Sequence, residues 1–199
     1  MIGIIDLGSS NLGSIQNLLK SLKVKYKLIK QSRSTNFSNY NKIILPGVGS
    51  FKRAMDNLKK NNLIKFLDLA YKKNIPILGI CLGMQLLCKS SEEGDTKCLG
   101  IIDSDVKKFD NKNLKVPQIG WNNITELKSK IFKGIKENEF VYMVHSYYVP
   151  KSNYTIASST YGINYSSAIN KNKFYGTQFH PEKSGSVGEK IIKNFIEEI

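Results

Sequence analysis

The sequence predicts an α/β fold: a single three-layer domain with a mostly parallel central sheet and antiparallel additions. Short apolar runs alternate with helix-like stretches through the first half, which is the pattern of strand-helix-strand units. The second half changes to period-two, β-branched segments, which favour antiparallel strands. The 199 residues suit one core, and no repeat or linker divides them. We therefore expect one domain over residues 1–199.

The first elements follow from where the apolar residues fall. A buried strand is expected at residues 1–6, and Asn11 can then cap a helix that runs to about Leu22, because leucines and isoleucines recur there at helical spacing. The next two strands are expected at residues 25–30 and 42–45. Together these segments predict the start of a parallel sheet.

The chain next passes through the loop Pro46-Gly47-Val48-Gly49, where two glycines permit backbone conformations closed to other residues. Helical material is expected from about Phe51 to Lys73, and a fourth buried strand at residues 76–80. That strand ends at Cys81, with a helix beginning immediately afterwards.

The second half contributes β segments and one closing helix at about residues 186–198. The expected β segments are 99–109, 115–124, 140–149, 154–160, 164–169 and 174–179.

Composition excludes several classes of function. The net charge of +14 could indicate nucleic-acid binding, but the lysines are scattered and only two of the 30 basic residues are arginine, so we expect no nucleic-acid partner. No apolar run approaches the roughly 20 residues that span a bilayer, and the first residues lack the features of a signal peptide. We expect a cytoplasmic protein without a membrane partner. The three cysteines form no CxxC pair, so neither a metal, a cofactor nor a disulfide is expected.

Gly79-Ile80-Cys81-Leu82-Gly83, termed the elbow from here on, places a cysteine between two glycines at a strand-to-helix turn. Such a sharp turn needs small flanking residues and exposes its central side chain above the carboxyl edge of the sheet. The positive end of the following helix favours a thiolate. Cys81 is therefore the candidate nucleophile, whereas Cys88 and Cys98 are expected to be inert core residues.

A thiolate that attacks an amide needs a proton donor for the departing ammonia, and histidine is the usual one near neutral pH. His180 lies at the end of an expected strand, with Glu182 two residues further on the same side of an extended segment. Glu182 could hold the imidazole in its productive tautomer. His145 is the only other histidine and the competing candidate for the base. We prefer His180 because it has a carboxylate nearby.

The segments GICLGMQ (79–85) and QFHPEKS (178–184) resemble the two signatures of the triad-type class I glutamine amidotransferases. The resemblance covers essentially the whole chain, because PGVGSF (46–51), VPQIGWN (116–122) and VHSYY (144–148) also match in order and spacing. It implies a flavodoxin-like fold, glutaminase activity, and a Cys81-His180-Glu182 triad. Five such motifs in sequence are far more specific than G-x-C-x-G alone.

The same resemblance implies further roles. Backbone N–H groups of Leu82 and of Gly47, Val48 and Gly49 would form the oxyanion hole, the loop contributing after a peptide rotation. Gln85 and Glu93 would hold the amino-acid end of glutamine, with backbone contacts from Ser146 and Tyr147.

The matching motifs also imply a partner. A cyclase or synthase subunit would form a heterodimer with this chain and receive its ammonia, in histidine biosynthesis or, alternatively, for amination of a sugar in a surface-polysaccharide pathway. The residues implied at the interface are Gln118, Trp121, Asn122 and Lys183, with core packing as the alternative for Trp121. A third interpretation, a binding module without catalysis, is disfavoured by the intact triad.

Overall fold

The computed structural model describes residues 1–8, 12–31, 39–110, 112 and 114–199. Asn11, the expected helix cap, lies outside these residues. Among the described residues the α-helices are α1 (Leu12–Ser21), α2 (Phe51–Lys60), α3 (Leu63–Lys72), α4 (Leu82–Leu86) and α5 (Gly185–Glu197), and the short 3-10 turns are η1 (Glu93–Asp95), η2 (Lys130–Phe132) and η3 (Pro181–Lys183).

One half of the main sheet is parallel, in the strand order β2-β1-β3-β4-β13. These strands are β1 (Ile2–Ile5), β2 (Tyr26–Ile29), β3 (Lys42–Gly47), β4 (Ile77–Cys81) and β13 (Phe174–Thr177). The expected parallel sheet is confirmed for β1 to β4. Segment 174–179 was expected to be an antiparallel addition, but its strand β13 runs parallel to β4 and is antiparallel only to β12. Because β3 and β4 run in the same direction and end in register at Gly47 and Cys81, the glycine loop and the elbow meet at one edge of the sheet.

The other half of the sheet continues β13-β12-β10-β7-β5-β6 and is largely antiparallel, with β11 paired to β12. Its strands are β5 (Cys88–Ser91), β6 (Thr96–Lys97), β7 (Ile102–Lys108), β10 (Tyr147–Pro150), β11 (Thr155–Tyr161) and β12 (Ile163–Lys171). Two further strands are β8 (Gln118–Asn123) and β9 (Phe140–His145). Among the described strands these two pair only with each other, so they form a separate two-stranded sheet. The expectation that segment 115–124 and the first part of segment 140–149 extend the main sheet was therefore wrong, whereas the second part of segment 140–149 does so as β10.

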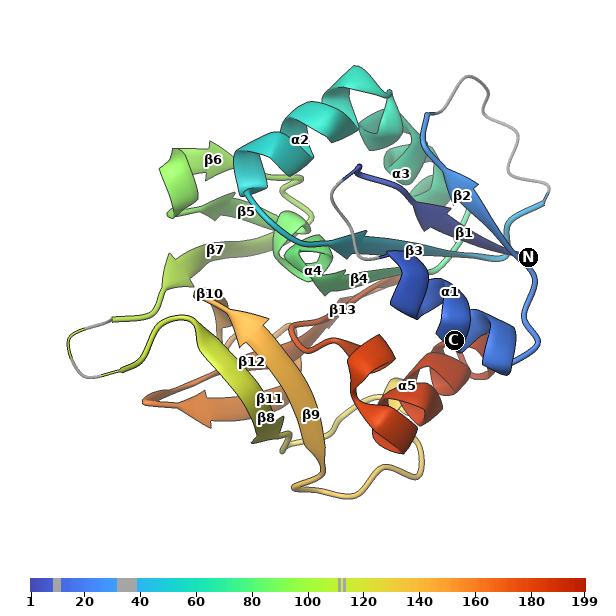
Figure 1. Ribbon diagram of the computed structural model, residues 1–199. Helices are drawn as coiled ribbons and strands as arrows, with labels where there is room; N and C mark the ends of the chain where they lie inside the picture. Colours follow the sequence, from blue (N-terminus) through green and yellow to red (C-terminus); the bar gives the residue numbers. More distant parts are fainter. Residues whose placement is uncertain (9–11, 32–38, 111, 113) are drawn as a thin grey trace.

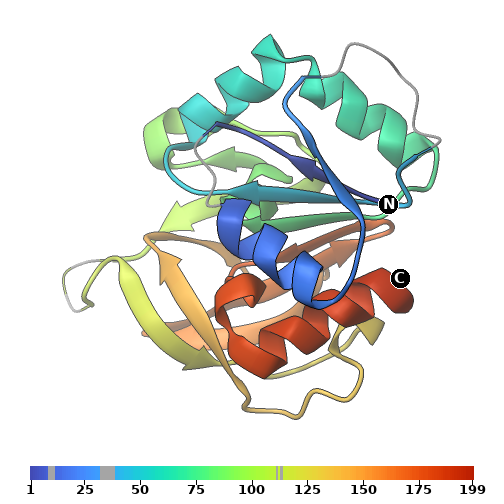
Figure 2. The ribbon, with the colours of Figure 1, turned by 45° about the vertical axis from the view of Figure 1, so that its right-hand side comes forward.

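The helices cover both faces of the parallel strands, giving three layers (Figures 1 and 2). Helices α2 and α3 pack on one face, and α1 and α5 on the other. Alternation along β3 feeds both cores: Ile43 and Leu45 point to the α2/α3 side, and Ile44 to the α1/α5 side. The sheet therefore carries apolar residues on both faces, as a buried parallel sheet requires.

Two expected elements differ in extent. The helical stretch expected from Phe51 to Lys73 is two helices, because the chain turns at Asn62, whose φ of 56° is left-handed and interrupts the helix. The helix after Cys81 is confirmed but ends at Leu86, and the chain re-enters the sheet at Cys88 as β5. That strand was not expected.

Among the described residues, α5 is the longest helix at 13 residues. None of the described helices combines the length and apolar character needed to cross a membrane.

Candidate active site

The elbow is held at the β4–α4 junction by close packing of its glycines. A Cβ on Gly79 would lie 2.6 Å from the backbone of Gly83, and one on Gly83 would collide with the Leu45 carbonyl group of β3. Any larger residue at either position would push α4 away from the sheet. Cys81 itself has φ 53° and ψ −108°, a strained conformation for a residue with a side chain. The sharp turn predicted from the glycines is therefore present.

The Cys81 sulfur lies at the base of a pocket rather than in the open, and the residue is 7% exposed. Val144 and Gln178 both contact the sulfur. The thiol donates to the Val144 carbonyl oxygen at 3.8 Å, and the Gln178 side-chain amide donates to the sulfur at 3.7 Å. Burial raises the pKa of Cys98 to about 12, and burial likewise raises the pKa of Cys88, so neither of these thiols is set up to ionise near neutral pH.

His180 and Glu182 form a buried pair, with His180 Nδ1 2.8 Å from Glu182 Oε1. The other ring nitrogen, Nε2, is buried and has no hydrogen-bond partner among the described residues. Burial by itself lowers the pKa of His180, but Cys81 and Glu182 both favour the charged ring, and the net effect raises the pKa to about 10. The arrangement thus favours a proton on His180 next to the cysteine.

The backbone of His180 is anchored to β9. Its N–H donates to the Tyr142 carbonyl oxygen at 3.0 Å, and its carbonyl accepts from the Ser184 hydroxyl at 2.7 Å. The same Ser184 oxygen accepts the N–H of Tyr142 at 3.0 Å. Position and orientation of the imidazole are therefore fixed by two elements, η3 and β9.

His145 lies in a different environment. Its Nδ1 is 2.7 Å from the Tyr147 carbonyl oxygen, which can only accept, and its ring contacts Phe109 and Tyr165, each with centroids 5.4 Å away. Burial lowers the pKa of His145 to about 4; the hydrogen bond to the Tyr147 carbonyl opposes this in part, and His180 adds a smaller lowering effect. This histidine is neutral near pH 7 and forms part of the pocket lining.

The pocket above Cys81 has a volume of about 310 Å³, near the lower end of the usual range for small-molecule sites. It brings together most of the residues that the motifs implied. Its lining comprises Val48, Gly49, Phe51, Cys81, Leu82, Gln85, Glu93, Pro117, Val144, His145, Ser146 and Tyr147. Phe51, Pro117 and Val144 were not anticipated. Gly47 lies just beneath, where a Cβ would approach Leu82 Cβ to 3.0 Å.

Two polar side chains in the pocket have defined partners. Glu93 Oε1 accepts the backbone N–H of Phe51, the first residue of α2, at 3.3 Å, so this acid is tied to the end of the glycine loop. Gln85 is buried, and its amide nitrogen donates to both the Tyr147 carbonyl oxygen and Gln178 Oε1, each at 2.7 Å. Both hydrogens of that nitrogen are used, which leaves the Gln85 carbonyl oxygen to offer a ligand.

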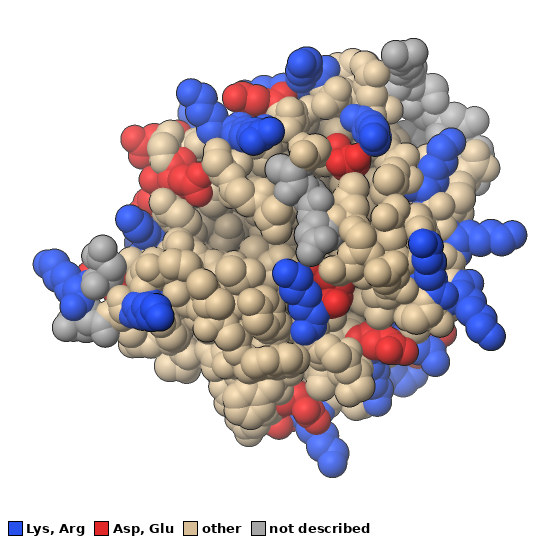
Figure 3. All heavy atoms as spheres, viewed as in Figure 1, with Lys and Arg blue, Asp and Glu red and all other residues tan. Residues whose placement is uncertain are grey.

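The β8–β9 sheet carries an exposed apolar surface next to this pocket. Ile119, Trp121 and Phe140 are 62%, 57% and 56% exposed, and the register places Ile119 opposite Val144, which lines the pocket. The area over β8 and β9 is mostly uncharged in Figure 3, with basic and acidic side chains around it. Core packing is thus excluded for Trp121. We call Ile119, Trp121 and Phe140 the apolar face.

The other residues implied at an interface lie around or beneath this face. Lys183 Nζ lies 5.7 Å from the ring centroid of Tyr142, and the Asn122 amide donates to the Thr160 carbonyl oxygen at 2.9 Å. Gln118 is only 4% exposed and accepts a hydrogen bond from the Tyr165 hydroxyl at 3.0 Å. In this conformation Gln118 supports the face from below and does not reach its surface.

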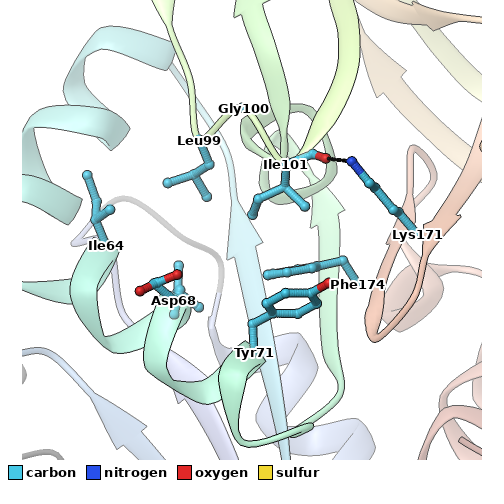
Figure 4. A pocket seen from close by; sticks show the side chains of 9 residues that line it. Ile64, Asp68, Tyr71, Leu99, Gly100, Ile101, Lys171 and Phe174 are labelled. Carbon is cyan, nitrogen blue, oxygen red and sulfur yellow. Dashed lines mark hydrogen bonds between the residues drawn. The ribbon is translucent and has the colours of Figure 1, made fainter.

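A second hollow, of about 410 Å³, lies between α3, the segment before β7 and the β12–β13 turn (Figure 4). Its walls are mainly apolar, including Ile64, Leu99 and Phe174. The charged groups there are already paired within the protein: Asp68 with Lys72 at 2.8 Å, and Lys171 with the Ile101 carbonyl oxygen at 2.7 Å. None of the candidate catalytic residues lines it. In the described part of the chain, His, Cys, Asp and Glu side chains form no group of three or more that could hold a metal ion.

The chain belongs to the class I glutamine amidotransferases, because that family matches residues 3–199. Among curated relatives, the imidazole glycerol phosphate synthase subunit HisH of Bacteroides fragilis (strain YCH46) is 46% identical over 198 residues, 98% of each chain. The subunit of the same name from Methanocaldococcus jannaschii is 46% identical over 202 residues, 99% of each chain.

Solved structures agree on the fold. The structure of PurLQS from Thermotoga maritima matches with a TM-score of 0.78 and 15% identity, over 99% of this chain and 97% of that one. A glutamine amidotransferase from the same organism matches with a TM-score of 0.67 and 18% identity, over 99% and 82%. The expected class I glutamine amidotransferase fold is confirmed.

Proposed function

We propose that this chain is the glutaminase subunit of an imidazole glycerol phosphate synthase. It hydrolyses glutamine to glutamate and ammonia, and a cyclase subunit takes up the ammonia in histidine biosynthesis. The observation that carries the proposal is the 46% identity to subunits of that name over nearly the full length of both chains. The relatives are named for this synthase rather than for a sugar-aminating one, which favours the histidine pathway over the alternative.

The proposed chemistry begins with attack of the Cys81 thiolate on the carboxamide carbon of glutamine. The tetrahedral intermediate collapses as His180 Nε2 gives its proton to the leaving nitrogen, releasing ammonia and leaving a glutamyl thioester. Water then attacks the thioester, with His180 as the base, and glutamate leaves as the thiolate re-forms. The raised pKa of His180 and its unpartnered buried Nε2 support this role, and Glu182 at 2.8 Å would keep that nitrogen directed at the sulfur.

The proposed oxyanion hole uses backbone donors at the two strand ends that meet beside Cys81. Leu82 is the first residue of α4, so its N–H has no acceptor within the helix. The second donor would come from the loop Gly47-Val48-Gly49 after a peptide rotation. Gly49 already has φ 93°, a conformation that glycine adopts without strain.

The substrate's amino-acid end would be held opposite the nucleophile. The Glu93 carboxylate and the free carbonyl oxygen of Gln85 are acceptors, which suits the α-ammonium group of glutamine. Backbone groups of Ser146 and Tyr147 line the same side of the pocket. Because Glu93 also accepts the N–H of Phe51, substrate binding would act directly on the end of the oxyanion loop.

The apolar face would receive the cyclase subunit, giving a heterodimer. An exposed tryptophan surrounded by other apolar side chains is the usual kind of interface anchor. The face adjoins the pocket through β9, whose Val144 carbonyl contacts the Cys81 sulfur and whose Tyr142 holds the backbone of His180. A partner docked there would cover the route by which ammonia leaves.

The proposal predicts a weak glutaminase that its partner activates. We would measure glutaminase kcat for the chain alone, with the cyclase subunit of the same organism, and with that subunit plus its acceptor ligand. A missing oxyanion donor is worth roughly 3 kcal/mol, so assembly with acceptor should raise kcat on the order of 100-fold, with a smaller change in KM.

The matched controls are Cys81→Ala, which should abolish turnover in every state, and Trp121→Ala, which should weaken activation while leaving the chain's own activity unchanged. Equal kcat in all three states would refute the activation step. Activation by a sugar-aminating synthase instead of the cyclase would move the chain to the alternative pathway.

A further inference from the structure

We infer that Gln178 is a positioning residue for the nucleophile: its side-chain amide donates to the Cys81 sulfur, in a direction that the Tyr147 carbonyl fixes through Gln85. The inference rests on the proposed function, because it assigns a role within the same site. Gln178 is the first residue of the QFHPEKS segment, but the sequence assigned it no role, and it is not among the residues that line the pocket.

Gln178 is fixed in place. It follows β13 directly, is fully buried, and its backbone N–H donates to the Ser167 carbonyl oxygen at 2.8 Å. The side chain runs from there between Cys81 and Gln85. A buried polar side chain of this length is tolerated when its amide groups are satisfied, and each end of this amide has a partner.

The direction of the amide follows from the hydrogen-bond chain itself. A backbone carbonyl can only accept, so the atom of Gln85 that lies 2.7 Å from the Tyr147 oxygen must be its nitrogen. That same nitrogen lies 2.7 Å from Gln178, so the facing atom of Gln178 must be its oxygen. The Gln178 nitrogen is then the atom that faces the Cys81 sulfur at 3.7 Å.

The Gln178 amide stabilises the thiolate form of Cys81 more than the thiol form. The thiol donates to the Val144 carbonyl oxygen and accepts from Gln178. On ionisation the first interaction is lost, whereas the second becomes a charge-assisted hydrogen bond to sulfur. Gln178 therefore favours the thiolate and holds it away from the Val144 carbonyl. The same chain keeps both hydrogens of Gln85 occupied, so that its oxygen remains the atom presented to substrate.

The test uses the pH dependence of Cys81 alkylation by iodoacetamide, followed on the Cys81 peptide by mass spectrometry so that Cys88 and Cys98 do not contribute. Gln178→Glu keeps the acceptor for Gln85 but turns a carboxylate oxygen toward the sulfur, and Gln178→Met removes the donor at similar size. We expect the midpoint of the alkylation profile to move up by about one pH unit in Gln178→Glu and about half as much in Gln178→Met.

Thr177→Val is the matched control, because it changes the neighbouring buried residue, whose hydroxyl has no hydrogen-bond partner among the described residues. Its midpoint should equal that of the wild type. Unchanged alkylation midpoints in the folded Gln178 variants would overturn the inference, and so would an equal shift in Thr177→Val. If Gln178→Glu does not fold, the midpoint of Gln178→Met decides. Alkylation of Cys81 does not require glutamine turnover. An inactive wild-type chain would therefore contradict the proposed function, but the alkylation midpoints of the wild type and the variants could still be compared.

Discussion

Both histidines are buried, and His145 lines the pocket whereas His180 lies next to Cys81 outside its lining, yet their neighbours shift the pKa of the ring in opposite directions. His180 has the Glu182 carboxylate at 2.8 Å and the Cys81 sulfur nearby, and its pKa is raised to about 10. His145 is enclosed by the rings of Phe109 and Tyr165, and its pKa is lowered to about 4. Burial disfavours the charge in both cases, so the nearby anionic groups decide which histidine can carry a proton.

The largest expected difference between the two sites is in catalysis, and it can be tested with the same substitution at both. Asparagine retains a donor near the position of Nδ1 but removes the proton-transferring Nε2. His180→Asn should lower kcat by about 1,000-fold, the usual scale of general acid-base catalysis, whereas His145→Asn should stay within about 10-fold. Glutaminase kcat of both variants, assayed with the partner, would check this; the reverse order would make His145 the base.

Removal of the Glu182 carboxylate should lower glutaminase kcat by a smaller factor than removal of the His180 imidazole. Glu182→Gln keeps the size of the side chain but leaves His180 without its anionic partner, so the imidazole loses both orientation and charge stabilisation. We expect kcat to fall by roughly 30- to 100-fold, less than for His180→Asn. The NMR titration of His180 should also shift to lower pH. A kcat loss without such a shift would mean that Glu182 orients the ring but does not set its charge.

The smallest expected effect concerns the stability of the fold toward acid. The pKa of His145 lies below its unfolded value of about 6.5, so the unfolded chain binds the proton more readily, and stability falls as pH drops from about 6.5 toward 4. Each pH unit in that window is worth about 1.4 kcal/mol. The pKa of His180 is raised to about 10, so its contribution is complete below about pH 6.5 and is lost progressively as pH rises from about 6.5 to 10, which is outside this window.

Urea unfolding at pH 7 and pH 5 measures this effect. Between these two values the wild type should lose about 2 kcal/mol more than His145→Asn, which has no titrating ring at that position. Because all other groups are shared, the difference between the two proteins isolates His145. If the wild type and His145→Asn lose the same unfolding free energy between pH 7 and pH 5, burial does not lower the pKa of His145 in the folded protein.

The fold was predictable where local signals decide it. Short apolar runs that alternate with helix-like stretches predicted the parallel half, and the glycines of the elbow predicted the turn, since Gly79 and Gly83 leave no room for a Cβ. Pairing partners were not predictable in the same way. Period-two alternation at β8 and β9 predicts strands but does not say which sheet they join. The break at Asn62 gave no Pro or Gly signal, because it comes from one left-handed residue.

The residues of the candidate site likewise fall into those that the sequence predicts and those that it does not. Cys81, His180 and Glu182 could be proposed from sequence because their chemistry and spacing are distinctive. The sequence assigned Gln178 no role and placed Gln118 at the wrong depth, since nothing in a sequence says that a glutamine is buried or which groups it contacts. Gln118 was expected at an interface but lies beneath it, held by Tyr165. Buried amides take their roles from long-range contacts, which only the assembled fold supplies.

The backbone at Cys81 bears on the history of this chain. A cysteine at φ 53° and ψ −108° costs of the order of 1–3 kcal/mol, and glycine would relieve much of that strain. A lineage that no longer needed glutamine hydrolysis would gain stability by replacing this one residue, and drift offers such replacements readily. A strained cysteine that has not been relaxed to glycine argues for continued selection on activity, and so against a descendant that keeps the fold only to bind.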